Sequence, residues 1–289
     1  MDLFWSETNA SASARERRPQ TVSVVIPALN EERNIGWVLG RLPDCVDEVI
    51  VVDGRSTDCT IEVALATRPD ARIVEEMTPG KGAALRAGFK HARGDRVVML
   101  DADGSMEPAE IGRYLARLEQ GFDLVKGSRF MPGGGTTDIS RVRVIGNFGL
   151  LTLANMMYGC RFTELCYGYM AFRRSVIPLL RLTADGFEIE TQIVANALRA
   201  GLRVAEVPSF EAARRFGESN LRTFRDGGRV LHELIKARLS VWPPAPLGPA
   251  PALPLAGTAG AALATTSPLA SAEAPGATTQ ISASPSSPL

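Results

Sequence analysis

Short runs of β-branched and aliphatic residues alternate with helix-like segments over the first half of the chain, and this alternation limits the possible folds most strongly. The strand-like segments lie at residues 22–26, 48–52, 71–75, 96–100 and 124–126. The helix-like segments between them lie at residues 31–42, 57–66, 81–92 and 108–120. A β-α-β-α order of this kind predicts an α/β fold, with a mostly parallel sheet flanked by helices on both faces. We therefore expect a Rossmann-like, nucleotide-binding sheet in a single domain.

The composition changes towards both ends of the chain. Residues 1–20 are rich in Ser, Ala, Arg and Glu and have no apolar periodicity. Ten of the 19 prolines fall within residues 242–289, where Glu273 is the only charged residue. Segments without an apolar face to bury cannot offset the entropy lost on ordering. We predict a disordered N-terminal arm at 1–20, a folded domain at 21–240, and a Pro/Ala/Ser-rich disordered tail at 241–289.

The charge balance and the rare residue types exclude several classes of function. The 32 Lys and Arg match 32 Asp and Glu, so the chain has no broad basic field for nucleic acid. Four cysteines without a C-x-x-C pair argue against a zinc cluster or a disulfide scaffold. Only two histidines are present, so we expect any metal ion to be held by carboxylate oxygens.

The sequence carries no export signal and no segment of membrane-spanning length. The N-terminus lacks a basic region followed by an apolar core, which a secretory signal requires. The most apolar long segment, residues 144–158, contains Gly and Asn residues and is shorter than the ~20 residues that span a bilayer. It predicts either a buried helix or a helix that docks on a membrane surface. We expect a cytoplasmic protein, either free of the membrane or peripheral at its inner face.

Unusual polar residues follow three of the predicted strands. They occupy residues 27–31 after the first strand, 53–58 after the second and 101–103 after the fourth. Ligands of parallel α/β sheets bind beyond the carboxyl ends of the strands. These three segments are therefore the candidate binding site.

Asp101 and Asp103 are the first candidates for metal binding. They are two residues apart, directly after an apolar run, so their side chains share one side if the extended geometry continues. Two carboxylates this close are unfavourable unless a cation neutralises them, and a hard divalent ion with open positions for phosphate oxygens would do so. The alternative is a loop with two solvated aspartates. Asp53 also ends a strand, where it either contacts a base or ribose or caps the next helix.

Basic and acidic residues in later loops complete the candidate site. Lys81 lies between two glycines at a helix start, a favourable place for an anion. Arg129 follows a short strand and can bind a phosphate through two parallel hydrogen bonds. Glu188 and Glu190 lie near another helix start, and one of them could take a proton from a hydroxyl nucleophile. Each of these assignments has an alternative. The lysine could lie in a flexible loop, the arginine could be a solvated charge, and the acidic residue could be an ordinary acid in the first turn of a helix.

Five segments together resemble a known family. Residues 24–31, 51–58, 80–82, 100–103 and 126–129 resemble, in this order, motifs of the family 2 glycosyltransferases with the GT-A fold. The closest resemblance is to the branch with the polyprenyl-phosphate mannose and glucose synthases, whose G-x-S-K/N-L loop is similar to residues 217–221. The resemblance covers about residues 21–240. It implies a GT-A fold and transfer of a sugar from a nucleoside diphosphate sugar.

The resemblance also implies a nucleotide pocket built after the first strands and at the third helix. Its members would be Pro27, Ala28, Asn30, Glu31, Asp53 and Lys81. In this assignment Asp53 contacts the base or ribose, and Lys81 lies near the nucleotide.

The reacting groups follow from the same resemblance. Asp101 and Asp103 would hold the sugar nucleotide through Mg²⁺ or Mn²⁺, with Asp103 as the direct ligand. Arg129 and Arg215 would bind phosphates. Glu190 occupies the position of the family's catalytic base. Two departures from the family pattern stand out: Gly54 replaces the second Asp of a D-D-G-S motif, and Gly104-Ser105 replaces the Leu-Gln that usually follows D-A-D.

The predicted function is inverting, metal-assisted transfer from a GDP- or UDP-linked sugar to an acceptor, with a polyprenyl phosphate as the preferred acceptor. Three alternatives remain open. The first is a retaining transferase that acts on a small phosphorylated acceptor such as phosphoglycerate. The second is a nucleotidyltransferase, although no G-x-G-T-R type loop follows the first strand. The third is a binding module without catalytic activity.

Overall fold

The structure is a computed structural model that describes residues 20–137, 141–217 and 223–240. The predicted arm at 1–20, apart from Gln20, and the predicted tail at 241–289 lie outside the described residues. The domain boundaries at 20 and 241 therefore remain predictions.

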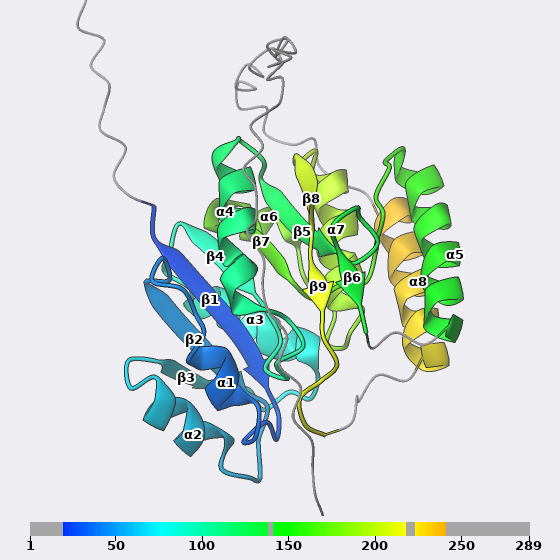
Figure 1. The fold of residues 1–289 in the computed structure, drawn as a ribbon. Coiled ribbons are helices and arrows are strands. Elements are labelled where there is room, and N and C mark those ends of the chain that lie inside the picture. The colour runs from blue at the N-terminus through cyan, green and yellow to red at the C-terminus, as the bar shows by residue number, and fades with distance from the viewer. Residues whose placement is uncertain (1–19, 138–140, 218–222, 241–289) are drawn as a thin grey trace, which may run out of the picture. The chain divides into compact units, whose positions relative to one another are not determined.

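A seven-stranded sheet forms the centre of the described fold (Figure 1). Its strand order is β3-β2-β1-β4-β7-β5-β8. Strand β7 pairs antiparallel with β4 and β5, and every other pair in this sheet is parallel. The strands are β1 Val22–Ala28, β2 Glu48–Asp53, β3 Arg72–Glu75, β4 Arg96–Met99, β5 Leu124–Ser128, β7 Met170–Arg173 and β8 Val204–Pro208. The predicted mostly parallel α/β sheet is confirmed.

Helices cover both faces of this sheet. The helices of the described residues are α1 Ile35–Leu39, α2 Thr60–Thr67, α3 Lys81–His91, α4 Ile111–Glu119, α5 Arg141–Tyr158, α6 Ile177–Leu180, α7 Ile189–Arg199 and α8 Thr223–Leu239, with short 3₁₀ turns η1 Pro108–Glu110 and η2 Arg174–Val176. Helices α1, α2 and α4 contribute to the core on one face, and α3, α6 and α7 to the core on the other. Both faces of the sheet are therefore shielded from water, as a parallel sheet requires.

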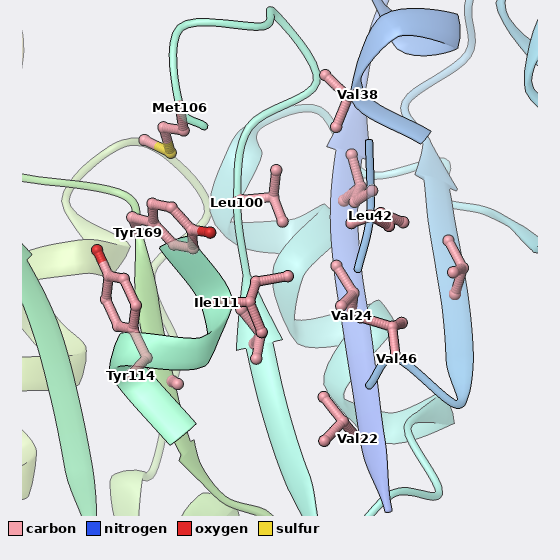
Figure 2. Close-up of a cluster of buried hydrophobic side chains, with 14 of the residues drawn as sticks. Val22, Val24, Val38, Leu42, Val46, Leu100, Met106, Ile111, Tyr114 and Tyr169 are labelled. Atoms are coloured by element: carbon pink, nitrogen blue, oxygen red, sulfur yellow. The ribbon is translucent and has the colours of Figure 1, made fainter. Parts of the chain in front are cut away.

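The β-branched run of β1 explains why this strand lies in the middle of the sheet. Val24 and Ile26 join the core under α1 and α4, whereas Val25 joins the core under α3 and α7. All three side chains are fully buried. Figure 2 shows the first of these cores, where Val24 and Leu100 face Ile111 of α4. Burial of one such side chain contributes about 1.5–3 kcal/mol.

Helices α5 and α8 form a third, smaller core beside the sheet (Figure 1). Leu151 and Ala154 of α5 pack there with Val230 and Leu234 of α8. The helix predicted at 144–158 is therefore present, but it is only partly buried. None of the helices in the described residues is both long enough and apolar enough to cross a bilayer.

Two predicted helices begin later than expected. The segment predicted as a helix at 31–42 contains only α1, because Glu31 and the residues to Asn34 form a turn in which the Glu31 amide donates to Thr60 Oγ1 (2.8 Å). Helix α2 begins at Thr60 rather than near Thr57, and Asp58 accepts hydrogen bonds from the Thr60 amide and hydroxyl. Side-chain hydrogen bonds thus hold the residues that precede each helix.

A small second sheet was not expected from the sequence. It pairs β6 (Gly135–Thr136) in parallel with β9 (Phe210–Glu211), and each strand has only two residues. An isolated bridge from Met106 to Glu211 joins this sheet to the loop after Asp103. The β6–β9 sheet therefore lies next to the candidate site.

Candidate active site

The loops that follow β1, β2 and β4 open into one cavity of about 1190 Å³. Because β2 and β4 flank β1 in parallel, their carboxyl ends lie next to each other. Predicted site residues that line this cavity are Pro27, Ala28, Glu31, Lys81, Asp101, Asp103, Arg129 and Glu190. The structure thus brings together most of the residues that the sequence pointed to.

Lys81 joins two of the predicted acidic residues. Its Nζ lies 2.6 Å from Asp101 Oδ1 and 2.7 Å from Glu190 Oε1. Burial opposes the charge of the Lys81 ammonium, but the Asp101 and Glu190 carboxylates outweigh this effect and raise its pKa. Burial also raises the pKa of Asp101 to about 6, against the opposite effect of Lys81. Lys81 is therefore a fixed cation in the middle of the acidic cluster.

The start of α3 is shaped by close contact with protein backbone. Gly80 has a φ of +122°, and a Cβ at this position would lie 2.1 Å from the Asp185 carbonyl oxygen. The Gly82 amide donates to the same carbonyl (2.7 Å). Gly80 and Gly82 thus allow the backbone of residues 184–186 to lie close to the start of α3. From the sequence we had expected these glycines to allow an anion to come close to the backbone.

Asp103 has a cationic neighbour of its own. Its Oδ1 accepts hydrogen bonds from the Ser105 amide and hydroxyl (3.0 and 2.7 Å). Its Oδ2 lies 3.5 Å from Arg214 Nη1, and Arg214 also pairs with Glu31. Glu31 is almost fully buried, and burial raises the pKa of its carboxyl. Arg214 therefore joins the loop after β1 to the loop after β4.

Arg214, rather than Arg215, reaches the cavity. The family resemblance assigned phosphate binding to Arg215, whose side chain instead lies over the Trp37 ring, 4.7 Å from its centroid. Arg215 is exposed and is not among the residues that line the cavity. The two arginines are adjacent in the sequence, so no pattern in it distinguished them.

Asp53 is buried at the end of β2 and holds the following loop. Its Oδ2 accepts hydrogen bonds from the Arg55 and Ser56 amides, both at 3.0 Å. Its Oδ1 is buried and has no hydrogen-bond partner among the described residues. Gly54 and Arg55 line the cavity, whereas Asp53 itself does not. The predicted contact of Asp53 with a base or ribose remains a prediction.

Asn30 connects the loops after β1 and β2. Its amide donates to Ser56 Oγ (2.9 Å), and its Oδ1 accepts a hydrogen bond from the Thr57 amide (2.8 Å). Asn30 is exposed, with a φ of +57°, and lies outside the cavity lining. In this structure it therefore orders the loops around the predicted nucleotide pocket.

Arg129 is held by two carboxylates. Its guanidinium forms ion pairs with Glu164 and with Glu211 Oε2 (2.6 Å for the latter), and it donates to the Cys166 carbonyl (3.1 Å). Burial opposes its charge, but Glu164 and Glu211 keep the Arg129 pKa raised. Arg129 lines the cavity with most of its donors already engaged, so a phosphate would have to compete with these carboxylates. Its phosphate-binding role remains a prediction.

The carboxylates of the cluster fit an Mg²⁺ or Mn²⁺ ion that is shared with a substrate diphosphate. Among the described residues, no three His, Cys, Asp or Glu side chains are arranged as a complete metal site. Mg²⁺ is commonly held by one or two carboxylates together with substrate phosphates, rather than by a complete protein cage. Glu31, Asp101, Asp103 and Glu190 carry two more charges than Lys81 and Arg214 balance. Asp101 and Asp103 are therefore suited to share a divalent ion with a diphosphate.

Three neighbouring residues complete the cavity wall without a signal in the sequence. Cys166, Tyr167 and Gly168 form a loop that lines the cavity beside Lys81 and Glu190. A Cβ on Gly168 would lie 2.7 Å from Lys81 Nζ and 2.9 Å from Glu190 Oε1. A larger residue at position 168 would therefore displace the ion pair.

The chain is similar in sequence to known proteins. The family model of glycosyl transferase family 2 matches residues 23–179. Glycosyltransferase AglJ of Haloferax volcanii is 35% identical over 223 residues, which is 75% of this chain and 72% of the relative. The undecaprenyl-phosphate mannosyltransferase of Micrococcus luteus is 33% identical over 212 residues, which is 69% of this chain and 87% of the relative.

The chain is also similar to a solved structure. Glucosyl-3-phosphoglycerate synthase from Mycobacterium tuberculosis, crystallised with Mn²⁺, UDP-glucose and phosphoglyceric acid, matches with a TM-score of 0.62. It is 29% identical, and the match covers 76% of this chain and 80% of the synthase. The GT-A type fold expected from the sequence is confirmed. The chain belongs to glycosyl transferase family 2 and is a glycosyltransferase.

Proposed function

We propose that this enzyme transfers a hexose from a GDP- or UDP-linked sugar to a polyprenyl phosphate, with inversion at the anomeric carbon. The observation that carries the proposal is the cluster of Asp101, Asp103, Lys81, Glu190 and Arg214 in one cavity, beyond the carboxyl ends of β1 and β4. Its carboxylates suit a divalent ion, and its cations suit the two phosphates of a sugar nucleotide.

The donor would lie across the loops after β1, β2 and β4. Pro27, Ala28 and Arg55 line the cavity on the side of β1 and β2, where the base would bind. The buried Oδ1 of Asp53 has no partner among the described residues, so it is available to accept a hydrogen bond from the base or ribose after a small movement of the loop. The diphosphate would then lie towards Asp101 and Asp103.

Catalysis in this proposal is mainly electrostatic. Negative charge grows on the diphosphate as its bond to the anomeric carbon breaks, and fixed cations stabilise that charge. Arg214 and Lys81 are positioned to do this, because ion pairs already hold both side chains at the cavity. Asp101 and Asp103 would hold Mg²⁺ or Mn²⁺, which supplies Lewis-acid stabilisation of the leaving diphosphate.

The nature of the acceptor decides what Glu190 does. A polyprenyl phosphate is already an anion, so its oxygen can attack the anomeric carbon without losing a proton. Glu190 would then orient Lys81, to which it is paired at 2.7 Å. A sugar hydroxyl would need a base, and Glu190 would take its proton. The undecaprenyl-phosphate mannosyltransferase among the relatives supports the lipid acceptor.

A second candidate is retaining transfer to a small phosphorylated acceptor. The TM-score of 0.62 to a synthase crystallised with UDP-glucose and phosphoglyceric acid favours it. Incubation with GDP-mannose or UDP-glucose, Mn²⁺, and either a polyprenyl phosphate or 3-phosphoglycerate separates the two candidates. Our proposal expects an inverted glycosyl phosphate of the lipid and release of nucleoside diphosphate. A retained product on phosphoglycerate alone would support the second candidate, and release of pyrophosphate would indicate nucleotidyl transfer.

A further inference from the structure

The segment that carries Arg214 lies along the loop that carries Asp103. Residues 211–216, which we call the Arg214 segment, run antiparallel to residues 103–106. Three backbone contacts join the two stretches: the Glu211–Met106 bridge, the Ala212 amide to the Ser105 carbonyl (2.9 Å), and the Arg215 amide to the Asp103 carbonyl (3.3 Å). The contact nearest Arg214 is longer than an ordinary N–H···O hydrogen bond. This end of the segment therefore depends largely on side-chain contacts.

The ring of Trp37 provides one such contact. The Arg215 guanidinium carbon lies 4.7 Å from the centroid of this ring, within the range of a cation–π interaction. Trp37 lies on α1, is half-buried and packs against the core on that face of the sheet, whereas Arg215 is exposed. A ring anchored in the core thus holds an exposed guanidinium in a defined place.

Gly104 allows both side chains to lie against the residue that follows Asp103. Its φ is +73°, and a Cβ here would lie 2.7 Å from Arg215 Cδ and 3.3 Å from Trp37 Cε3. The departure from the family pattern at this position, which usually has Leu, therefore has a structural consequence. A leucine side chain would need the space that the stem of Arg215 fills, so the contact between Arg215 and Trp37 depends on this glycine.

The turn before α1 holds the same segment by further contacts. Arg33 lies over the Phe216 ring, 4.0 Å from its centroid, and Asn34 Nδ2 donates to the Phe216 carbonyl (3.1 Å). Glu31 of this turn pairs with Arg214, which also donates from Nε to the Phe216 carbonyl (2.9 Å). The turn and α1 together therefore form the surface against which the Arg214 segment packs.

We propose that Trp37 and Arg215 are positioning residues of the sugar-nucleotide site. Their contact holds the Arg214 segment against residues 103–106, and so it fixes the Arg214 guanidinium and the Asp103 carboxylate where a diphosphate and its metal ion would bind. Neither Trp37 nor Arg215 lines the cavity, so both act through the residues that do. The inference rests on the proposed function, because it assumes that a nucleoside diphosphate sugar binds at Asp103.

Isothermal titration calorimetry of the full chain with UDP and with GDP, each in the presence of Mn²⁺, tests the positioning role. A cation–π contact at an exposed site shifts an equilibrium about two- to fivefold, so we expect Arg215→Ala to weaken binding of the preferred nucleotide by about this factor. Arg215→Lys keeps a cation over the ring and should restore most of the affinity. Trp37→Leu should also weaken binding, and addition of Arg215→Ala to it should have no further effect.

The matched control is Arg41→Ala. The Arg41 guanidinium also lies over the Trp37 ring, 4.9 Å from its centroid, but Arg41 is outside the Arg214 segment and pairs with Glu107. This control removes the same charge from the same ring without changing the segment. We therefore expect it to bind the nucleotide as the wild type does.

Fluorescence of Trp37 tests the contact itself. The chain has tryptophans at positions 5, 37 and 242, so Trp5→Phe with Trp242→Phe leaves Trp37 as the only one. Acrylamide should quench Trp37 more strongly in Arg215→Ala, because the ring loses its cover. Coupling between two sites is reciprocal, so if the contact favours nucleotide binding, the bound nucleotide favours the contact by the same factor. UDP or GDP with Mg²⁺ should therefore reduce the quenching of Trp37, and Arg215→Ala should lose this effect.

The possible results distinguish this inference from the proposed function. Equal binding by Arg215→Ala and the wild type would overturn the positioning role and leave the proposed function intact. An equal loss in Arg215→Ala and Arg41→Ala would also overturn it, because the loss would then reflect charge alone. Quenching of Trp37 that Arg215→Ala does not change would overturn the contact. A wild type that binds neither UDP nor GDP would refute the proposed donor, and the positioning role with it. Thermal unfolding of each variant verifies that it is folded.

Discussion

Lys81→Met replaces the cation that joins Asp101 and Glu190 with an uncharged side chain of similar length. The Lys81 Nζ lies 2.6 Å from Asp101 and 2.7 Å from Glu190, and the Lys81 and Glu190 side chains are each 10% exposed. Removal of one partner from a buried ion pair costs about 3–5 kcal/mol, because the remaining charge is left without compensation. The Asp101 side chain is 26% exposed and keeps some contact with water. We therefore expect a loss near the lower end of this range, about 3 kcal/mol.

Urea unfolding, followed by circular dichroism, measures this loss. Lys90→Met is the matched control on the same helix, since Lys90 is exposed, and we expect it to change the free energy of unfolding by less than about 0.5 kcal/mol. Mn²⁺ should stabilise Lys81→Met more than it stabilises the wild type, because a divalent ion can occupy the place of the lost ammonium. A loss below about 1 kcal/mol, or no difference in the response to Mn²⁺, would refute this account of the cluster.

Three further predictions concern the same cavity. Asp103→Ala should abolish metal-dependent transfer, and activity that persists unchanged in the presence of a chelator would contradict the metal assignment. Glu190→Gln should leave turnover near normal with a polyprenyl phosphate, whereas a large loss in kcat would identify Glu190 as a base for a hydroxyl acceptor. Burial raises the pKa of the Cys166 thiol to about 12, so at about pH 8 iodoacetamide should label exposed Cys59 first and the partly buried Cys166 much more slowly. Early labelling of Cys166, read by mass spectrometry, would show that the cavity wall is more open than in this structure.

The sequence was most informative where one local pattern determines the structure. The first strand was expected at 22–26 and extends over β1, because a β-branched run buried on both faces has few alternatives. The acidic residues after β4 and Lys81 at the start of α3 line one cavity, and the sequence had pointed to these loops because strand ends in a parallel sheet lie at one edge.

Other features depend on contacts between distant residues and left no local signal. Strand β7 has four residues and inserts antiparallel between β4 and β5, so it brings together parts of the chain far apart in sequence. The choice between Arg214 and Arg215 depends on which side chain reaches Glu31, 183 residues away for Arg214. The buried ion pairs of Arg129 with Glu164 and Glu211 were missed for the same reason.

The central claim is that the cluster around Asp101 and Asp103 binds a sugar nucleotide together with a divalent ion. Thermal unfolding of wild type and Asp103→Ala, with GDP- and UDP-sugars in the presence and absence of Mn²⁺, tests this claim most directly, because a ligand that binds only the folded state raises the unfolding temperature. Our account predicts that one of these sugar nucleotides stabilises the wild type when Mn²⁺ is present, and that Asp103→Ala loses this effect. Stabilisation that is equal in both proteins, or independent of Mn²⁺, would contradict it.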